Sequence, residues 1–142
     1  MSQSKSPITR EVLQEWADGS PFIRACRMEI VSADPEQGIV EMRMPLQEML
    51  QRAPGHAQFH GGPVASLIDT AGDFAVAMMV SGTVPTINFR VDYVRPSSGA
   101  YLVARATARR VGRTVSVADV DVFDEQGRLT AIGRGTYGSQ PG

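Results

Sequence analysis

One stretch of the sequence predicts a long apolar helix, and this helix restricts the folds that the rest of the chain can adopt. Apolar residues recur there at helical spacing, at Val64, Leu67, Ile68, Ala71, Ala75 and Met78. Pro63 suits the first helical position, because the N–H group that proline lacks has no partner there. We expect a helix of about 18 residues, roughly 27 Å long, that ends at Val80 and is enclosed by a larger element.

Six segments with the composition of β-strands surround the predicted helix. Two precede it and four follow it, at residues 24–32, 39–44, 85–94, 101–109, 114–123 and 129–137. A short amphipathic helix over residues 8–17, with Trp16 as its anchor, comes before all of them. One long helix among strands predicts the α+β class: a curved antiparallel β-sheet wrapped around a central helix, plus a short N-terminal helix on its edge.

The expected strand at residues 114–123 has an unusual pattern. Val115 and Val117 share a face with Asp119 and Asp121. Either a β-bulge shifts the strand, or the apolar residues form a second contact surface. Because such a face is too apolar for full solvation, the pattern favours self-association of the chain.

Composition excludes several classes of protein. The 142 residues suit one folded domain, and a net charge of −1 argues against general nucleic-acid binding. A single cysteine, Cys26, excludes an internal disulfide and a cysteine-rich metal site, and it favours a reducing compartment. No apolar run reaches the length of a membrane span, and residues 1–7 form a polar tail. We expect a cytoplasmic protein with neither a bound metal nor a membrane partner.

The start of the central helix predicts a binding site. The amides of Gly61 and Gly62 lie at the positive end of the helix, where backbone N–H groups bind oxyanions. Asp69 lies about two turns further along the same helix. Bare amides and a carboxylate together can polarise a carbonyl group and attack it. The alternatives are that the glycines only form the turn and that Asp69, like Asp73, only faces solvent.

The sequence His60-Gly61-Gly62, followed by Asp69 on the helix and by the strand at residues 86–96, resembles the hotdog-fold acyl-CoA thioesterases of the phenylacetate-pathway type. The resemblance extends from about residue 24 to residue 137. It implies a tail and short helix over residues 1–20 and a single hotdog domain over residues 21–142. It also implies homodimers whose sheets join edge to edge, often paired again as dimers of dimers, with active sites at the subunit interface.

The resemblance also implies roles for individual residues. Asp69 matches the acidic residue that activates water or attacks the thioester. The backbone N–H of Gly61 matches the group that holds the thioester oxygen, and Gly62 is a candidate substrate-binding residue beside it. His60 matches a positioning histidine, and Thr86 matches a residue that orients water.

At one position the sequence departs from the family pattern. Relatives commonly carry an asparagine six residues before the histidine, where this chain has Pro54. Either Gln58 substitutes for that asparagine as a substrate-binding residue, or the role is missing. The loop at residues 46–59, together with Phe74 and Met78, is expected to shape the acyl pocket.

Three arginines, Arg109, Arg110 and Arg113, cluster at a predicted hairpin turn. One interpretation is a solvated hairpin tip. The other is a clamp for the phosphates of coenzyme A, because the fork of donors on arginine matches phosphate oxygens.

The sequence therefore predicts hydrolysis of an acyl-CoA, aromatic or medium- to long-chain, to a free acid and coenzyme A. No cofactor is needed, because coenzyme A is part of the substrate. The alternatives are a hydroxyacyl dehydratase that pairs His60 with Asp69, a non-catalytic acyl-CoA-binding protein, and a structural role.

Overall fold

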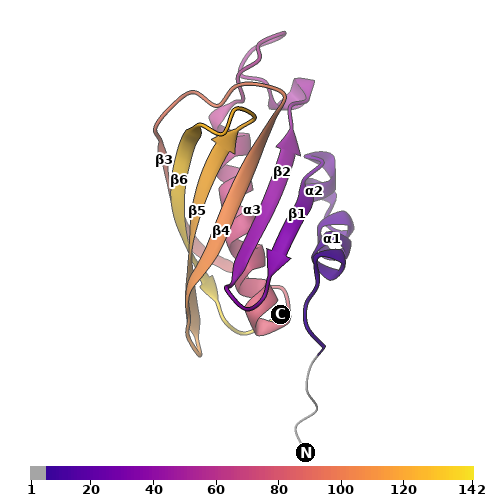
Figure 1. Ribbon diagram of the computed structural model, residues 1–142, viewed down its shortest axis with the longest axis vertical. Helices are drawn as coiled ribbons and strands as arrows, with labels where there is room; N and C mark the ends of the chain where they lie inside the picture. The colour runs from indigo at the N-terminus through magenta and orange to yellow at the C-terminus, as the bar shows by residue number, and fades with distance from the viewer. Residues whose placement is uncertain (1–5) are drawn as a thin grey trace, which may run out of the picture.

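A computed structural model describes residues 6–142, so most of the predicted polar tail lies outside the described residues. The helices and strands follow in the order α1 (Arg10–Gly19), α2 (Pro21–Ala25), β1 (Glu29–Asp34), β2 (Ile39–Pro45), the 3-10 helix η1 (Glu48–Leu50), α3 (Gly61–Val80), β3 (Thr86–Tyr93), β4 (Tyr101–Val111), β5 (Val115–Asp124) and β6 (Leu129–Gly138). The predicted α+β hotdog fold, with a curved sheet around one long helix, is confirmed (Figure 1).

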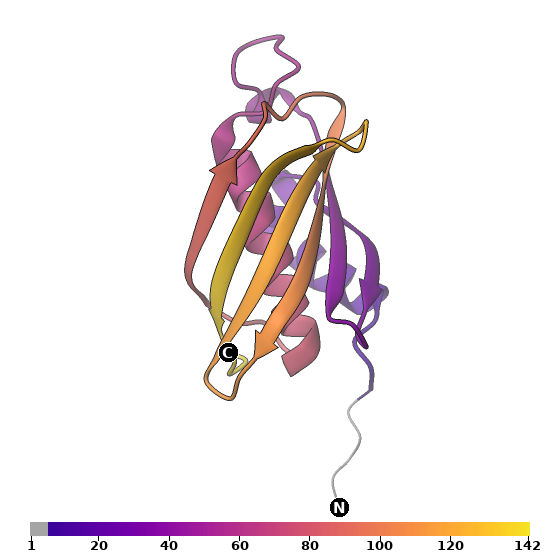
Figure 2. The same ribbon diagram turned by 60° about the vertical axis from the view of Figure 1, so that its left-hand side comes forward.

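The six strands form one antiparallel sheet in the order β1-β2-β4-β5-β6-β3, and the sheet curves around α3 (Figure 2). Its inner face packs on α3, because alternate residues of each strand point to the same side. The fully buried residues at this contact include Leu67, Ile68, Ala71, Ala75, Leu102, Ala104, Ala106 and Val122. The core therefore lies between the helix and the concave face of the sheet.

The helix α3 begins earlier than the sequence indicated. Its first residue is Gly61, so Pro63 occupies the third helical position rather than the first. The side chain of His60 caps the helix and accepts a hydrogen bond from the N–H of Gly62, which stabilises a start ahead of the proline. By length and composition α3 is apolar enough to cross a membrane, contrary to the sequence prediction. More than half of the helix is nevertheless buried in the core of the protein.

The N-terminal region contains two helices where the sequence predicted one. After α1, the hydroxyl of Ser20 accepts a hydrogen bond from the N–H of Ile23, and Pro21 occupies the first turn of α2. A proline preceded by a capping serine starts a helix as readily as it ends the previous one. The first strand therefore begins at Glu29 instead of residue 24, and that boundary prediction was wrong.

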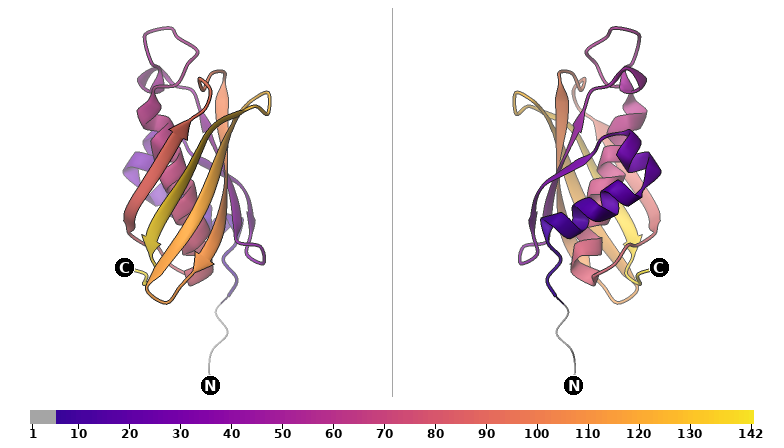
Figure 3. Two further views of the ribbon diagram at one scale, coloured as in Figure 1. Left: turned by 90° about the vertical axis from the view of Figure 1, so that its left-hand side faces the viewer. Right: turned by 90° about the vertical axis from the view of Figure 1, so that its right-hand side faces the viewer.

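The helix α1 crosses in front of α3 on the side away from the sheet (Figure 3, right). Leu13 and Ala17 are fully buried in the main core. The N–H of Ile30 donates to the side-chain oxygen of Gln14 at 2.7 Å, which joins α1 to the edge strand β1. Trp16, the predicted anchor, is only partly buried, and it lines a pocket next to α3.

The alternation in β5 is regular. Ser116, Ala118, Val120 and Val122 are buried on the inner face, and Val115 and the other odd-numbered residues lie on the outer face. The pairing of β5 is irregular at two points, but in each case the extra residue lies in the neighbouring strand. One point is in β4, between Ala108 and Arg110, and the other is in β6, opposite Val122 and Phe123. A bulge within the pattern of β5 is therefore not the reason that valines and aspartates share the outer face.

The two edges of the sheet differ. The edge strand β1 is bonded to α1, whereas β3 and the residue after it present large apolar side chains to the surface. Ile87, Phe89, Tyr93 and Val94 are 56%, 40%, 55% and 54% exposed. An edge strand with free backbone groups and exposed apolar side chains is a template for pairing with another chain.

Candidate active site

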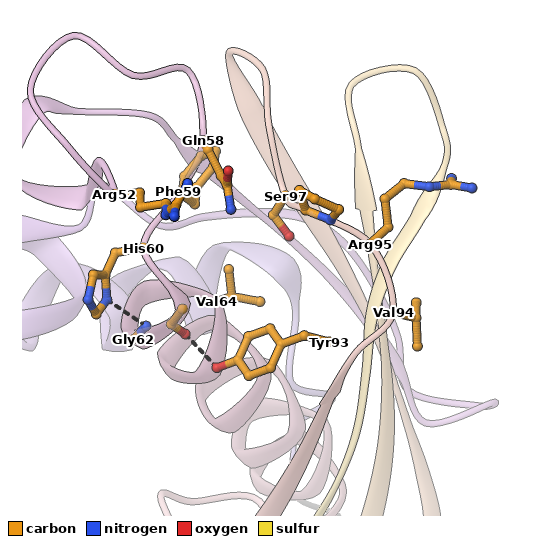
Figure 4. A pocket seen from close by; sticks show the side chains of 12 residues that line it. Arg52, Gln58, Phe59, His60, Gly62, Val64, Tyr93, Val94, Arg95 and Ser97 are labelled. Atoms are coloured by element: carbon orange, nitrogen blue, oxygen red, sulfur yellow. Dashed lines mark hydrogen bonds between the residues drawn. The ribbon is translucent and has the colours of Figure 1, made fainter.

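The start of α3 holds one free amide and one occupied amide. The N–H of Gly62 donates to Nδ1 of His60 at 3.0 Å, and the hydroxyl of Tyr93 donates to the carbonyl oxygen of Gly61 at 2.7 Å (Figure 4). Within residues 6–142, no acceptor is present for the N–H of Gly61. Of the two predicted oxyanion donors, Gly61 is thus available and Gly62 is engaged by His60.

A pocket of about 680 Å³ surrounds this free amide. It is lined by residues of the preceding loop, the start of α3 and the segment after β3: Arg52, Gln58, Phe59, His60, Gly61, Gly62, Val64, Tyr93, Val94, Arg95, Pro96 and Ser97 (Figure 4). The predicted Gln58 lies in this pocket. Pro54 does not, since it lines a separate hollow in the exposed loop.

Asp69 lies two turns along α3 and is held by β3 and β6. The hydroxyl of Thr86 donates to its Oδ1 at 2.8 Å, which brings together two of the predicted residues. The hydroxyl of Tyr137 donates to the backbone carbonyl of Asp69 at 3.0 Å. Burial raises the pKa of the Asp69 carboxyl, and the hydrogen bond from Thr86 partly opposes that rise.

The side chain of Tyr137, a residue of β6, extends to the backbone of Asp69 through a narrow space between the sheet and α3. A Cβ atom added to Gly72 or to Gly135 would overlap the Tyr137 hydroxyl. Burial raises the pKa of this hydroxyl, so it remains a proton donor to the Asp69 carbonyl. The tyrosine is fully buried and therefore fixes the distance between α3 and the sheet at this point.

Asp73 is a second carboxyl of this region, and the sequence did not indicate its importance. Burial, and then the negative charge of Asp69, raise its pKa from 3.8 to about 7. In the described part of the chain its carboxylate has no hydrogen-bond or ion-pair partner. Helical periodicity placed it on the polar side of α3, but α1 covers that side with Trp16.

Both carboxyls border a pocket of about 240 Å³ between α3 and the N-terminal helices. Its lining consists of Trp16, Ser20, Ile23, Asp69, Thr70, Asp73, Phe74 and Thr83. Phe74 lines this pocket, which contains no residue of the loop at 46–59, and Met78 is buried in the main core. Their role in shaping the acyl pocket stays a prediction.

One protomer does not bring Gly61 and Asp69 together. Asp69 lies eight positions after Gly61, which corresponds to about 12 Å of helix rise, and the two residues line different pockets. The predicted arginine cluster lies at the opposite end of the sheet from the pocket of Gly61 (Figure 2). There Arg109 forms an ion pair with Asp119, at 3.4 Å on the outer face.

The curved sheet, its central helix and a helix start with a free amide define a hotdog-fold protein. The family model of the thioesterase superfamily matches residues 57–131. A protein of Halobacterium salinarum is 39% identical over 115 residues, which are 73% of this chain and 76% of the relative. The acyl-coenzyme A thioesterase PaaI of Escherichia coli is 33% identical over 114 residues, 79% and 77% of the two chains.

Solved structures agree with these sequence relatives. A thioesterase from Haemophilus influenzae superposes with a TM-score of 0.82 at 27% identity, over 94% of this chain and 92% of that chain. The chain belongs to the thioesterase superfamily and is a thioester hydrolase.

Proposed function

We propose that the substrate is an acyl-CoA and that the site of hydrolysis is shared by two copies of the chain. The observation that carries the proposal is the pair of groups on α3: the free N–H of Gly61, and Asp69 oriented by Thr86. The relative PaaI, which is named as an acyl-coenzyme A thioesterase, supports the choice of acyl-CoA.

The strand β3 connects the two groups. Its first residue, Thr86, contacts Asp69, and its last residue, Tyr93, contacts Gly61. If two copies pair antiparallel along β3 about a twofold axis, the Asp69 end of one strand lies beside the Gly61 end of the other. Such a pairing also covers the exposed side chains of Ile87 and Phe89. It forms two equivalent sites per dimer.

In the proposed reaction the thioester carbonyl accepts a hydrogen bond from the N–H of Gly61. In one route, Asp69 of the partner subunit removes a proton from water, and the resulting hydroxide attacks the carbonyl carbon. The oxyanion collapses, the carbon–sulfur bond breaks, and the leaving thiolate takes up the proton. In the other route, the carboxylate of Asp69 attacks the carbonyl carbon itself, collapse of the oxyanion breaks the carbon–sulfur bond and leaves a mixed anhydride, and water then hydrolyses that anhydride. Because a thiolate is a good leaving group, a strong general acid and a cofactor are both unnecessary.

The test is the release of free thiol from a panel of acyl-CoA substrates, aromatic and aliphatic, followed with a thiol-reactive dye. We expect release from at least one acyl-CoA, and we expect it to persist with a chelator present. Loss of substrate without thiol release would contradict hydrolysis and favour the hydroxyacyl dehydratase. Binding without any turnover would favour an acyl-CoA-binding protein. The cytoplasmic location and the role of the hairpin arginines remain predictions.

A further inference from the structure

Two arginines of the pocket at the start of α3 are not neutralised by the protein. Within residues 6–142, neither the Arg52 nor the Arg95 side chain has a hydrogen-bond or ion-pair partner. The described lining of this pocket contains no aspartate or glutamate. In a chain with a net charge of −1, this pocket carries two formal positive charges, and its lining also includes Gly61 with its free N–H.

The arginines that line the hollow on the outer face of the sheet have acidic partners. Arg134 and Arg109 both contact Asp119, at 2.6 and 3.4 Å, and Arg105 contacts Glu41 at 3.0 Å. The hollow on the outer face of the sheet therefore contains its own counter-charges. An anion gains less from an arginine that already holds a carboxylate, so the pocket of Arg52 and Arg95 is the stronger anion site.

The placement of the two side chains suits a long substrate. Arg52 lies near Phe59, whereas the guanidinium of Arg95 is directed away from His60 (Figure 4). In an acyl-CoA the pantetheine arm separates the phosphates from the thioester. Cations that bind the phosphates must therefore lie away from the amide that binds the thioester oxygen.

We propose that Arg52 and Arg95 bind the phosphate groups of coenzyme A while the thioester lies at the N–H of Gly61. This inference rests on the proposed acyl-CoA substrate. Arginine suits the role because its planar fork of donors binds phosphate oxygens in a bidentate manner. Arg52 and Arg95 then replace Arg109, Arg110 and Arg113 as the phosphate-binding residues.

The test compares two substrates with the same acyl group. One is the acyl-CoA, and the other is the thioester of N-acetylcysteamine, which has no phosphate. In Arg52→Gln and in Arg95→Gln we expect KM for the acyl-CoA to rise about tenfold each. We expect kcat, and both constants for the short thioester, to remain unchanged. Added salt should raise KM for acyl-CoA in the natural protein and have little effect in the double variant.

Matched variants complete the design. Arg10→Gln, which removes a charge on α1, should leave kcat and KM unchanged for both substrates. Equal losses on both thioesters, or no loss on either, would overturn the proposal. The proposal would also be overturned if KM for the acyl-CoA alone rose in Arg109→Gln, Arg110→Gln or Arg113→Gln and did not rise in Arg52→Gln or Arg95→Gln.

Calorimetry with free coenzyme A separates this inference from the proposed function. If no thioester is hydrolysed but coenzyme A binds to the natural protein and about a hundredfold more weakly to the double variant, the phosphate site stands and the proposed function fails. If both proteins bind coenzyme A equally well, the phosphate site is excluded even though hydrolysis remains. Lack of binding to the natural protein excludes the phosphate site too.

Discussion

The two pockets along α3 have opposite electrical character. The pocket at the helix start contains Arg52 and Arg95 and lacks acidic lining residues within the described chain, whereas the pocket in the middle contains Asp69 and Asp73. The first suits an anionic substrate and a developing oxyanion. The second suits removal of a proton. In the proposed function the two pockets are complementary halves of one site, with one half from each copy of the chain.

The substitution with the largest expected effect removes the base from the acidic half. Asp69→Asn keeps the size of the side chain but cannot accept a proton, so kcat should fall by about 10³. Steady-state thiol release measures it. Glu36→Gln, which removes an exposed carboxylate from the β1–β2 turn, is the control. Retained turnover in Asp69→Asn would refute its role.

The basic half can be tested by removing one N–H group. Gly61 is the first residue of α3 and follows an extended residue, so proline fits there without breaking the helix. Gly61→Pro should lower kcat by about 10²–10³, the usual effect of losing an oxyanion donor. Gly61→Ala is the matched control, since it keeps the N–H and adds the same contact with the Tyr93 hydroxyl at 3.3 Å. Similar kcat values for the two variants would count against Gly61 as the donor.

A third substitution separates the two halves. Phe89→Lys places like charges on facing β3 edges, so the proposed dimer should dissociate and activity should fall together with it. Light scattering coupled to gel filtration gives the mass, and thiol release gives the activity. Val31→Lys introduces the same charge on the β1 edge and should affect neither the mass nor the activity. An active monomer would exclude a shared site.

The smallest expected effect is on stability. The pKa of Asp73 is about 7 in the folded protein, above its ordinary value of 3.8, so the folded state binds its proton more tightly. Stability is therefore lost as pH rises from about 4 to about 7. Asp73→Asn should raise Tm by roughly 3–6 °C at pH 8 and by less at pH 5. Calorimetric scans at both pH values measure this, and an equal shift at both would show that ionisation of Asp73 is not responsible.

The sequence was sufficient to predict the elements with strong periodicity. Alternating strands and the apolar face of α3 are local patterns, so the α+β class followed from them. The five residues of α2 are too few to show a period, and the Ser20–Pro21 pair was interpreted only as a stop. The structure brings Thr86 and Asp69 into contact, and both residues had been named from resemblance to a family and not from spacing.

The remaining features of the site depend on contacts between distant segments. The hydrogen bond from Tyr93 to Gly61 joins residues 32 apart in the sequence. The raised pKa of Asp73 depends on burial, to which Trp16 contributes as a neighbour in the same pocket. Neither is visible in helical periodicity, which describes one element at a time. The free arginines Arg52 and Arg95 were missed for the same reason, because only the fold shows which cations have acidic neighbours.

The passage of Tyr137 between α3 and β6 restricts how this sequence can vary. Gly72 and Gly135 have no room for a side chain while the hydroxyl of Tyr137 donates to the carbonyl of Asp69. Substitutions at these three positions are therefore coupled to one another. A chain with alanine at either glycine needs a smaller side chain at residue 137. Helix α3 then lacks the hydrogen bond that restrains the position of Asp69 relative to the sheet.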